Sequence, residues 1–194
     1  MRFDPRLTLS VDSTAKLFQK DAMNIISTLR PLILLSFLAA TFQANAVEVA
    51  GYSFKAPADW KSSPPSSNMR KAQFSAPGKS GKNGEVVFYY FGSGGAGGVK
   101  ANVDRWMKQF ENPQGQSVKT ETVSGTKVTY AQAHGTYLSG RPFGPKTPNP
   151  GHAMLAAIIE GKQGAIFVKM TGPKETVEAH SAKLKKMVTD SLAK

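Results

Sequence analysis

The segment MLAAIIEGKQGAIFVKM, residues 154–170, decides how the chain is expected to fold. Residues 154–159 are all apolar, five of the six residues at 165–170 are apolar, and the residues between the two stretches include two glycines. This pattern predicts two buried strands joined by a short hairpin. Because apolar residues fill both alternating sets of positions, the sheet is expected to be covered on both faces.

Two stretches with a helical period can supply that cover. One spans 99–111 and ends before Pro113, because proline cannot continue a helix. Its apolar face comprises Val99, Val103, Trp106, Met107 and Phe110. The other spans 173–193, where Pro173 and Glu175 suit a first helical turn. Its apolar face comprises Val177, His180, Leu184, Met187 and Val188.

Glycine and proline divide the rest of the chain into short pieces, which is typical of strands. Five more strands are expected, at 47–54, 69–76, 85–91, 117–124 and 126–138. Residues 61–68 and 139–152 are rich in serine, proline or both and are expected to be loops. The predicted fold class is α+β, with a largely antiparallel sheet of about seven strands flanked by two main helices.

Composition excludes several function classes. The 194 residues include 25 Lys and Arg, 13 Asp and Glu and no cysteine, and 40% are apolar. The apolar content is sufficient for a packed core. The absence of cysteine excludes disulfides, thiolate metal sites, a cysteine nucleophile and a lipid-modified N-terminal cysteine.

The N-terminal region predicts export. Arg30 precedes a short apolar run at 31–42, and Ala44 and Ala46 form an A-x-A cleavage pattern, as in a secretory signal peptide. The run is shorter than the roughly 20 residues that span a bilayer. We expect cleavage between Ala46 and Val47. Because 1–22 delays the apolar run and contains acidic residues, we also expect translation to start at Met23.

The remaining chain, 47–194, is expected to be a single α+β domain, periplasmic or secreted. It has 20 basic and 10 acidic residues, a net charge of +10. The basic residues are mostly dispersed lysines, which usually form a solvated surface, although attraction to anionic envelope components is compatible with them. Export argues against a nucleic acid partner, and no membrane span is expected after cleavage.

The segment YSFKAPADW, residues 52–60, resembles the opening of PsbP-like proteins, in which an aromatic strand is followed by proline and tryptophan. The closing order of strand, hairpin, strand, Gly172-Pro173 and amphipathic helix is also similar. This resemblance covers most of 47–194 at the level of element order. It implies a central antiparallel sheet flanked by helices, in a fold shared by photosystem extrinsic subunits, a Ran-binding import factor and exported bacterial proteins of unknown role. Members of this group mostly bind and assemble, and no site motif is matched here.

Residues 92–97, GSGGAG, match the G-x-G-x-x-G pattern of dinucleotide sites between a strand and a helix. Such a site also needs a parallel strand and an acidic residue about 20 residues later. The following strands are expected to be antiparallel, so the stretch predicts a flexible loop. Anion or partner contact at the helix N-terminus, near Lys100, stays open.

Catalytic and metal-binding patterns are weak. His134, His152 and His180 match no zinc spacing and are expected to be structural. Ser124 and Lys127 fit S-x-x-K, but in a predicted hairpin turn instead of at a helix start. The acidic residues are dispersed along the chain. We therefore expect no catalytic residue, no cofactor and no metal ion. Trp106 is expected in the core and Trp60 at the sheet edge.

These observations predict an exported, non-enzymatic binding or accessory protein whose partner is an unidentified protein or an anionic envelope component. Alternatives are a small periplasmic ligand carrier or enzyme with a cleft built from loops, and a structural protein held to anionic envelope polymers. Since loops often hold binding residues, contacts are expected in the glycine loop and in the loop at 141–151. The candidate contact residues are Gly94, Gly95, Gly97, Lys100, Arg141 and Phe143.

Overall fold

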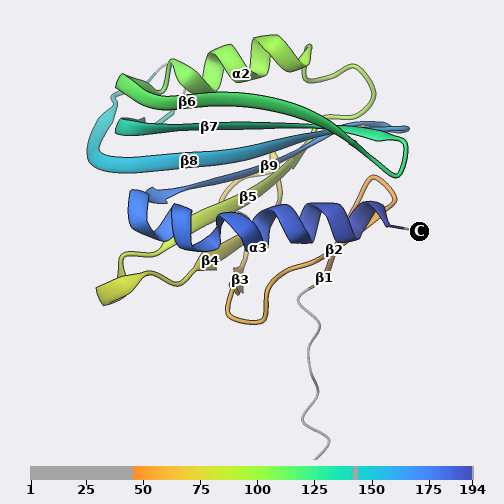
Figure 1. The fold of residues 1–194 in the computed structure, drawn as a ribbon, viewed down its shortest axis with the longest axis horizontal. Coiled ribbons are helices and arrows are strands. Elements are labelled where there is room, and N and C mark those ends of the chain that lie inside the picture. Colours follow the sequence, from red (N-terminus) through yellow and green to blue (C-terminus); the bar gives the residue numbers. More distant parts are fainter. Residues whose placement is uncertain (1–45, 142–143, 194) are drawn as a thin grey trace, which may run out of the picture. The chain divides into compact units, whose positions relative to one another are not determined.

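The computed structural model of the chain describes residues 46–141 and 144–193 (Figure 1). Seven strands form one antiparallel sheet in the order β3-β4-β5-β9-β8-β7-β6. Their bounds are β3 Lys61–Ser63, β4 Arg70–Ala76, β5 Gly84–Tyr90, β6 Phe110–Val123, β7 Thr126–Ser139, β8 Thr147–Gly161 and β9 Gly164–Pro173. The predicted α+β class is confirmed. The predicted signal peptide and the Met23 start lie outside the described residues.

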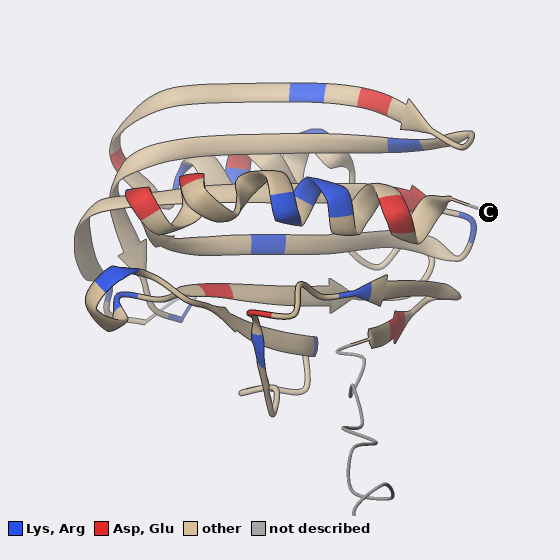
Figure 2. Cartoon of the chain, turned by 60° about the horizontal axis from the view of Figure 1, so that its bottom comes forward, with Lys and Arg blue, Asp and Glu red and all other residues tan. Residues whose placement is uncertain are grey.

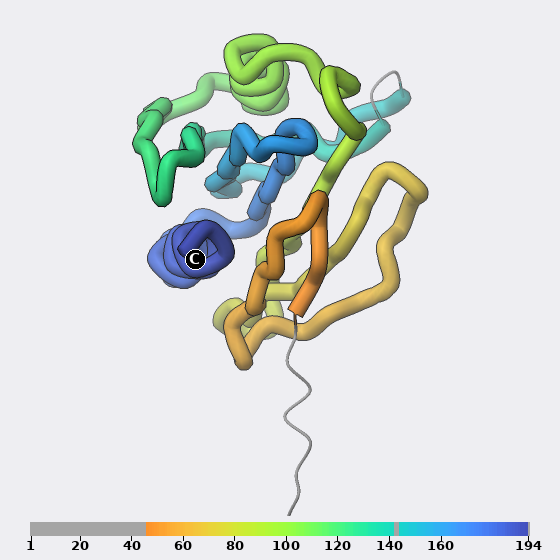
Figure 3. The backbone as a smooth tube through the Cα atoms, turned by 90° about the vertical axis from the view of Figure 1, so that its right-hand side faces the viewer, coloured from red at the N-terminus to blue at the C-terminus, as the bar shows by residue number. Residues whose placement is uncertain are grey.

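The two helices lie on opposite faces of the sheet, which Figure 3 shows from one end of the strands. They are α2 (Val99–Met107) and α3 (Lys174–Leu192), and a short 3-10 turn, η1, spans Lys79–Gly81. Strands β1 (Ala46–Val49) and β2 (Tyr52–Lys55) form a separate hairpin. Their side chains Val49 and Phe54 join the core on the α3 face.

The alternation of side chains along β9 supplies both cores. Ile166, Val168 and Met170 belong to the large core beneath α3, together with Leu184. Phe167 belongs to a smaller core beneath α2. The expected burial of the hairpin at 154–170 on both faces is therefore confirmed.

Several predicted boundaries are wrong. Residues 47–54 are not one strand, because the chain turns at Ala50 and Gly51, both of which have positive φ. The predicted loop at 61–68 begins with the edge strand β3. Helix α2 ends at Met107, earlier than expected, and the chain enters β6 at Phe110.

Strands β6 and β8 are longer than predicted. Both contain proline at positions where no neighbouring strand requires a hydrogen bond from the backbone N–H. In β6, an edge strand, Pro113 lies between paired residues where the register shifts. In β8, Pro148 and Pro150 precede His152, where pairing with β9 begins. Proline is accepted where its missing N–H is not required by a neighbouring strand. The connection at 139–152, expected to be a long loop, is therefore strand at Ser139 and from Thr147 onward.

Candidate functional site

The most unusual polar side chain of the described fold is Lys169, in the middle of β9. Its backbone neighbours are Val87 on β5 and Ala156 on β8. Two residues after Phe167, it lies on the same, α2-covered face of the sheet. Only 8% of the residue is exposed. Lysine is rarely buried to this extent without an acidic partner.

The end of α2 and strand β7 surround the Lys169 ammonium with neutral groups. The Nζ atom donates a hydrogen bond to Oε1 of Gln109 and lies 3.4 Å from the Tyr137 hydroxyl. It is 5.3 Å from the centre of the Tyr137 ring and 5.9 Å from that of Trp106. Both ring faces attract a cation.

Backbone hydrogen bonds fix Gln109 in this position. Its N–H donates to the carbonyl of Trp106 at 3.1 Å, and its own carbonyl accepts from the N–H of Leu138 at 2.7 Å. The turn after α2 is thereby tied to β7, beside Tyr137. The amide that holds Lys169 is therefore preorganised by the fold.

No described carboxylate neutralises Lys169. The ion pairs between side chains of residues 46–141 and 144–193 all involve other cations. Burial lowers the pKa of Lys169 to about 7, against a weaker opposing effect of Glu85. Burial also raises the pKa of Tyr137 to about 12, so that its phenol stays protonated. Lys169 is thus a buried amine with a pKa near neutral, held by the side-chain oxygen of Gln109 and bordered by the Tyr137 hydroxyl and two aromatic rings.

Half-buried polar and aromatic residues extend from Lys169 across β5 and β4. Arg70 pairs with Glu85 at 2.6 Å and donates to Gln73 at 2.9 Å. Tyr89 stacks on Phe91 with ring centres 6.2 Å apart, and Phe91 is 43% exposed. We call this surface the Lys169 patch: Lys169, Gln109, Tyr137, Tyr89, Arg70 and Glu85.

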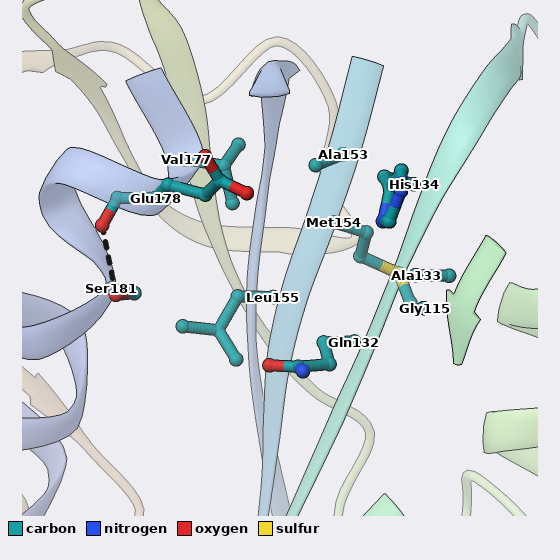
Figure 4. A pocket seen from close by; sticks show the side chains of 10 residues that line it. All are labelled: Gly115, Gln132, Ala133, His134, Ala153, Met154, Leu155, Val177, Glu178 and Ser181. Atoms are coloured by element: carbon teal, nitrogen blue, oxygen red, sulfur yellow. Dashed lines mark hydrogen bonds between the residues drawn. The ribbon is translucent and has the colours of Figure 1, made fainter. Parts of the chain in front are cut away.

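A concave feature lies on the opposite face, between α3 and strands β7 and β8 (Figure 4). It is a pocket of about 180 Å³. Leu155 and Val177 are apolar parts of its lining, and Gln132, His134, Glu178 and Ser181 are polar parts. We call it the α3 groove. Its volume is below the several hundred Å³ that are usual for sites that bury a drug-sized ligand.

His134 is the most constrained polar residue of the α3 groove. Its ring lies directly over Gly115, where an added Cβ would be 2.6 Å from Cε1. Its Nε2 is 3.4 Å from Nζ of Lys174, which is 3.8 Å from Glu178. Any larger residue at position 115 would therefore displace the imidazole.

The glycine loop predicted from the sequence lies between β5 and α2. Gly94 and Gly97 have φ of 75° and 74°, which a larger residue would adopt only with strain. The Asn102 side-chain amide donates to the carbonyls of Ala96 and Gly98 at 3.0 and 2.9 Å. The loop carbonyls are thus turned toward α2 by the buried Asn102, which was not predicted from the sequence. Gly95 is exposed within this turn.

The other predicted contact residues are separated in the fold. Lys100, whose side chain is 89% exposed, pairs with Asp104 at 2.7 Å. Arg141 is exposed and follows the end of the sheet where Ser139 of β7 pairs with Thr147 of β8. The glycine loop lies at the opposite end of the sheet, after the pair formed by Tyr90 and Ile166. The structure therefore does not bring Lys100 and Arg141 into one site. Phe143 lies outside the described residues.

His180 has hydrogen-bond partners at both of its ring nitrogens. His180 is buried, accepts a hydrogen bond at Nδ1 from Trp60 Nε1 at 2.9 Å, and so donates from Nε2 to the Pro77 carbonyl at 2.8 Å. This confirms His180 as a satisfied structural histidine. Trp60, predicted to plug the sheet edge, directly precedes the edge strand β3 and is buried in the core of the α3 face. Within the described part of the chain, no three His, Asp or Glu side chains are grouped closely enough to hold a metal ion.

Comparisons with known proteins establish the fold. No family model matches the sequence, and no curated protein matches it. The structure is similar to cyanobacterial PsbP (CyanoP) from Synechocystis, with a TM-score of 0.50 and 14% identity over 79% of this chain and 94% of that one. A protein of unknown function from Pseudomonas aeruginosa gives a TM-score of 0.39 and 12% identity over 75% and 93%. The fold is PsbP-like, as the resemblance at 52–60 implied.

The Lys169 patch was not predicted from the sequence. One signal was present, since Lys169 is the only charged residue of the apolar stretch AIFVKM. Its position, two residues after Phe167, placed it on a face that a helix was expected to cover. The partners Gln109 and Tyr137 are distant in the sequence and become neighbours only through the register of the strands.

Proposed function

We propose that this chain is an exported, non-enzymatic binding protein of PsbP-like fold, and that the Lys169 patch receives an acidic group of its partner. The observation that supports this proposal is the burial of a lysine that forms no ion pair with a described carboxylate. Such burial is unfavourable for folding, so a fold that retains it is a candidate for function at that position.

The chemistry of the patch suits an acidic group. A carboxylate or phosphate oxygen at Lys169 would form a hydrogen bond in which donor and acceptor are both charged, which is stronger than the bond from the ammonium to the neutral Gln109 amide. The protonated phenol of Tyr137 offers a second donor nearby. The aromatic rings of Tyr89 and Phe91 supply apolar area beside these donors, which is the composition typical of interface centres.

The same geometry favours binding over catalysis. Proton transfer from or to Lys169 needs a base or acid within hydrogen-bond reach. Among the described residues, the Nζ atom contacts an amide oxygen and a phenol whose pKa is about 12. Neither group exchanges protons readily near neutral pH, so the amine is suited to holding an anion.

Export is part of the proposal and rests on the sequence at 30–47. Cleavage between Ala46 and Val47 would remove only the first residue of β1, whose pairing with β2 continues through Val49. No helix in the described ranges is long and apolar enough to cross a membrane. The intact mass of protein recovered outside the cytoplasm tests this part, and a mass that includes residues 31–46 would contradict it.

The binding proposal is tested by thermal shift with citrate, inorganic phosphate, poly-glutamate and an anionic glycan as probes. We expect at least one probe to stabilise the protein, Lys169→Met to abolish that shift, and Lys162→Met to retain it. Lys162 is the matched control because it is an exposed lysine of the same charge at the β8–β9 turn, outside the Lys169 patch. Equal shifts in all three proteins, or no shift with any of these anions, would contradict the proposal.

A small-ligand carrier is the second candidate function, and the α3 groove is the observation that favours it. An uncharged probe that stabilises the protein, with an effect lost in His134→Ala but kept in Lys169→Met, would support this alternative.

A structural role on anionic polymers would depend on the positive charge of the surface alone. Figure 2 shows basic and acidic residues interspersed on the strands and on α3, without a continuous basic face in that view.

A further inference from the structure

Strand β6 leaves one edge of the seven-stranded sheet without a neighbouring strand in the described chain. Its pairing with β7 is regular from Ser117 to Val123, whereas the register shifts are confined to 111–117. Residues 118–122 are all exposed, and Val118 is 53% exposed. A regular, exposed edge of this length is able to pair with another strand.

The β6–β7 turn determines which backbone groups face outward. Ser124 and Gly125 have φ of 47° and 79°, as in a two-residue type I′ hairpin turn. In such a hairpin the closing residues, Val123 and Thr126, form a hydrogen-bonded pair, and the pairs then alternate along the ladder. The N–H and C=O groups of Val118, Thr120 and Thr122 therefore face away from β7.

A side-chain contact agrees with this assignment. The Oγ1 atoms of Thr120 and Thr129 are 2.8 Å apart across the two strands. Side chains approach most closely at non-hydrogen-bonded pairs, which is the pair type that the turn assigns to Thr120. The outward backbone groups of Thr120 are thus available to a new strand.

We propose that two copies of this chain pair antiparallel through residues 117–123 of β6, with the two-fold axis at Thr120. In this register Thr120 faces Thr120 of the second copy, and Val118 faces Thr122. The outward groups of these residues can form six backbone hydrogen bonds across the axis. The two seven-stranded sheets then become one continuous sheet.

Charge selects this register. Lys119 and Glu121 lie on one face of β6, and the axis at Thr120 places each Lys119 opposite Glu121 of the second copy. An axis at Lys119 or at Glu121 would instead place two like charges opposite each other, which is destabilising. An axis at Val118 or Thr122 leaves both charged residues without a charged neighbour and shortens the overlap.

A single strand pair buries little surface, so the dimer should be weak and depend on concentration. Its dissociation is measured by sedimentation of the purified protein over a wide concentration range. Lys119→Glu or Glu121→Lys should each raise the dissociation constant at least about tenfold, because each creates two like-charge pairs. Lys162→Glu is the matched control, since it changes the charge equally at an exposed turn outside β6.

Two further samples make the test specific to this register. The double variant K119E/E121K should restore the wild-type constant within about twofold. An equimolar mixture of the two single variants should form heterodimers, because one strand then has two acidic residues and the other two basic ones. A protein that is monomeric throughout, or single variants that dimerise like wild type, would overturn the proposal. So would a double variant as weak as the single variants.

Discussion

The two faces of the sheet differ in the elements that cover them and in the partners of their buried polar side chains. The α3 face is covered by a helix of 19 residues and the β1–β2 hairpin, and its buried polar pair, Trp60 and His180, is hydrogen-bonded. The α2 face is covered by a helix of nine residues, and it buries Lys169 without a described carboxylate partner. The first face therefore has the larger apolar cover, and our proposal assigns binding to the second.

The largest expected effect is on the α3 face. Leu184 is 0% exposed and packs in the large core. Leu184→Ala should lower the free energy of unfolding by about 2–5 kcal/mol, because it removes buried methyl groups and leaves a cavity. Urea denaturation measures this change. A loss below about 0.5 kcal/mol would show that α3 is dispensable for the fold.

An effect of opposite sign is expected on the α2 face. Lys169→Met replaces a buried amine by an apolar side chain of similar length, which should raise the free energy of unfolding at pH 6 by about 1–4 kcal/mol. A variant less stable than wild type at this pH would mean that the contacts with Gln109 and Tyr137 stabilise the fold more than charge burial destabilises it.

The gain from Lys169→Met should also depend on pH. The pKa of Lys169 is about 7 in the folded protein and near its ordinary 10.5 after unfolding. Between these values the unfolded state binds more protons, so wild-type stability should rise as the pH increases from about 7 to 10.5. The difference between variant and wild type should therefore shrink over this window. Parallel pH profiles for the two proteins would contradict the burial of the charged amine.

A smaller loss is expected from the buried polar pair on the α3 face. His180→Leu removes the acceptor of the Trp60 indole bond and the donor to the Pro77 carbonyl. The free energy of unfolding should fall by about 1–3 kcal/mol, since buried polar groups lose partners. Thermal melts and urea curves measure this change, and an unchanged melting temperature would exclude a structural role for His180.

The smallest effects on stability are expected in the two loops. Lys100→Ala and Arg141→Ala alter exposed side chains and should change the free energy of unfolding by less than about 0.5 kcal/mol. If a loop contacts the partner, we expect capture to weaken in only one of the two variants, because the residues lie at opposite ends of the sheet. Equal weakening in both would require a partner that spans the whole domain.

The sequence was sufficient to predict the elements that have a clear apolar pattern of their own. The patterns of the hairpin at 154–170 and of helix α3 each fit only one type of secondary structure and one side of burial. The extension of β8 to Thr147 was not predictable, because Pro148 and Pro150 usually end strands and are tolerated here only where β9 has not yet joined. Whether a strand accepts proline at such a position depends on its pairing with neighbouring strands, which the local sequence does not encode.

The candidate site was less predictable than the fold. A lysine in an apolar strand can extend its amine to the surface or bury it, and the sequence does not distinguish these outcomes. Burial of Lys169 depends on Gln109 and Tyr137, which lie 60 and 32 residues away. Similarly, the separation of Lys100 from Arg141 follows from strand register and not from any local pattern.

The most direct test of the account is the titration of the Lys169 amine by NMR, with the resonance assigned by its loss in Lys169→Met. We predict a midpoint near pH 7 in the free protein. With the anion that stabilises the protein in the thermal-shift test, the midpoint should move upward, because a bound negative charge favours the ammonium. A midpoint near 10.5 in the free protein, or one that this anion leaves unchanged, would contradict the claim that the α2 face holds a buried amine for an acidic partner.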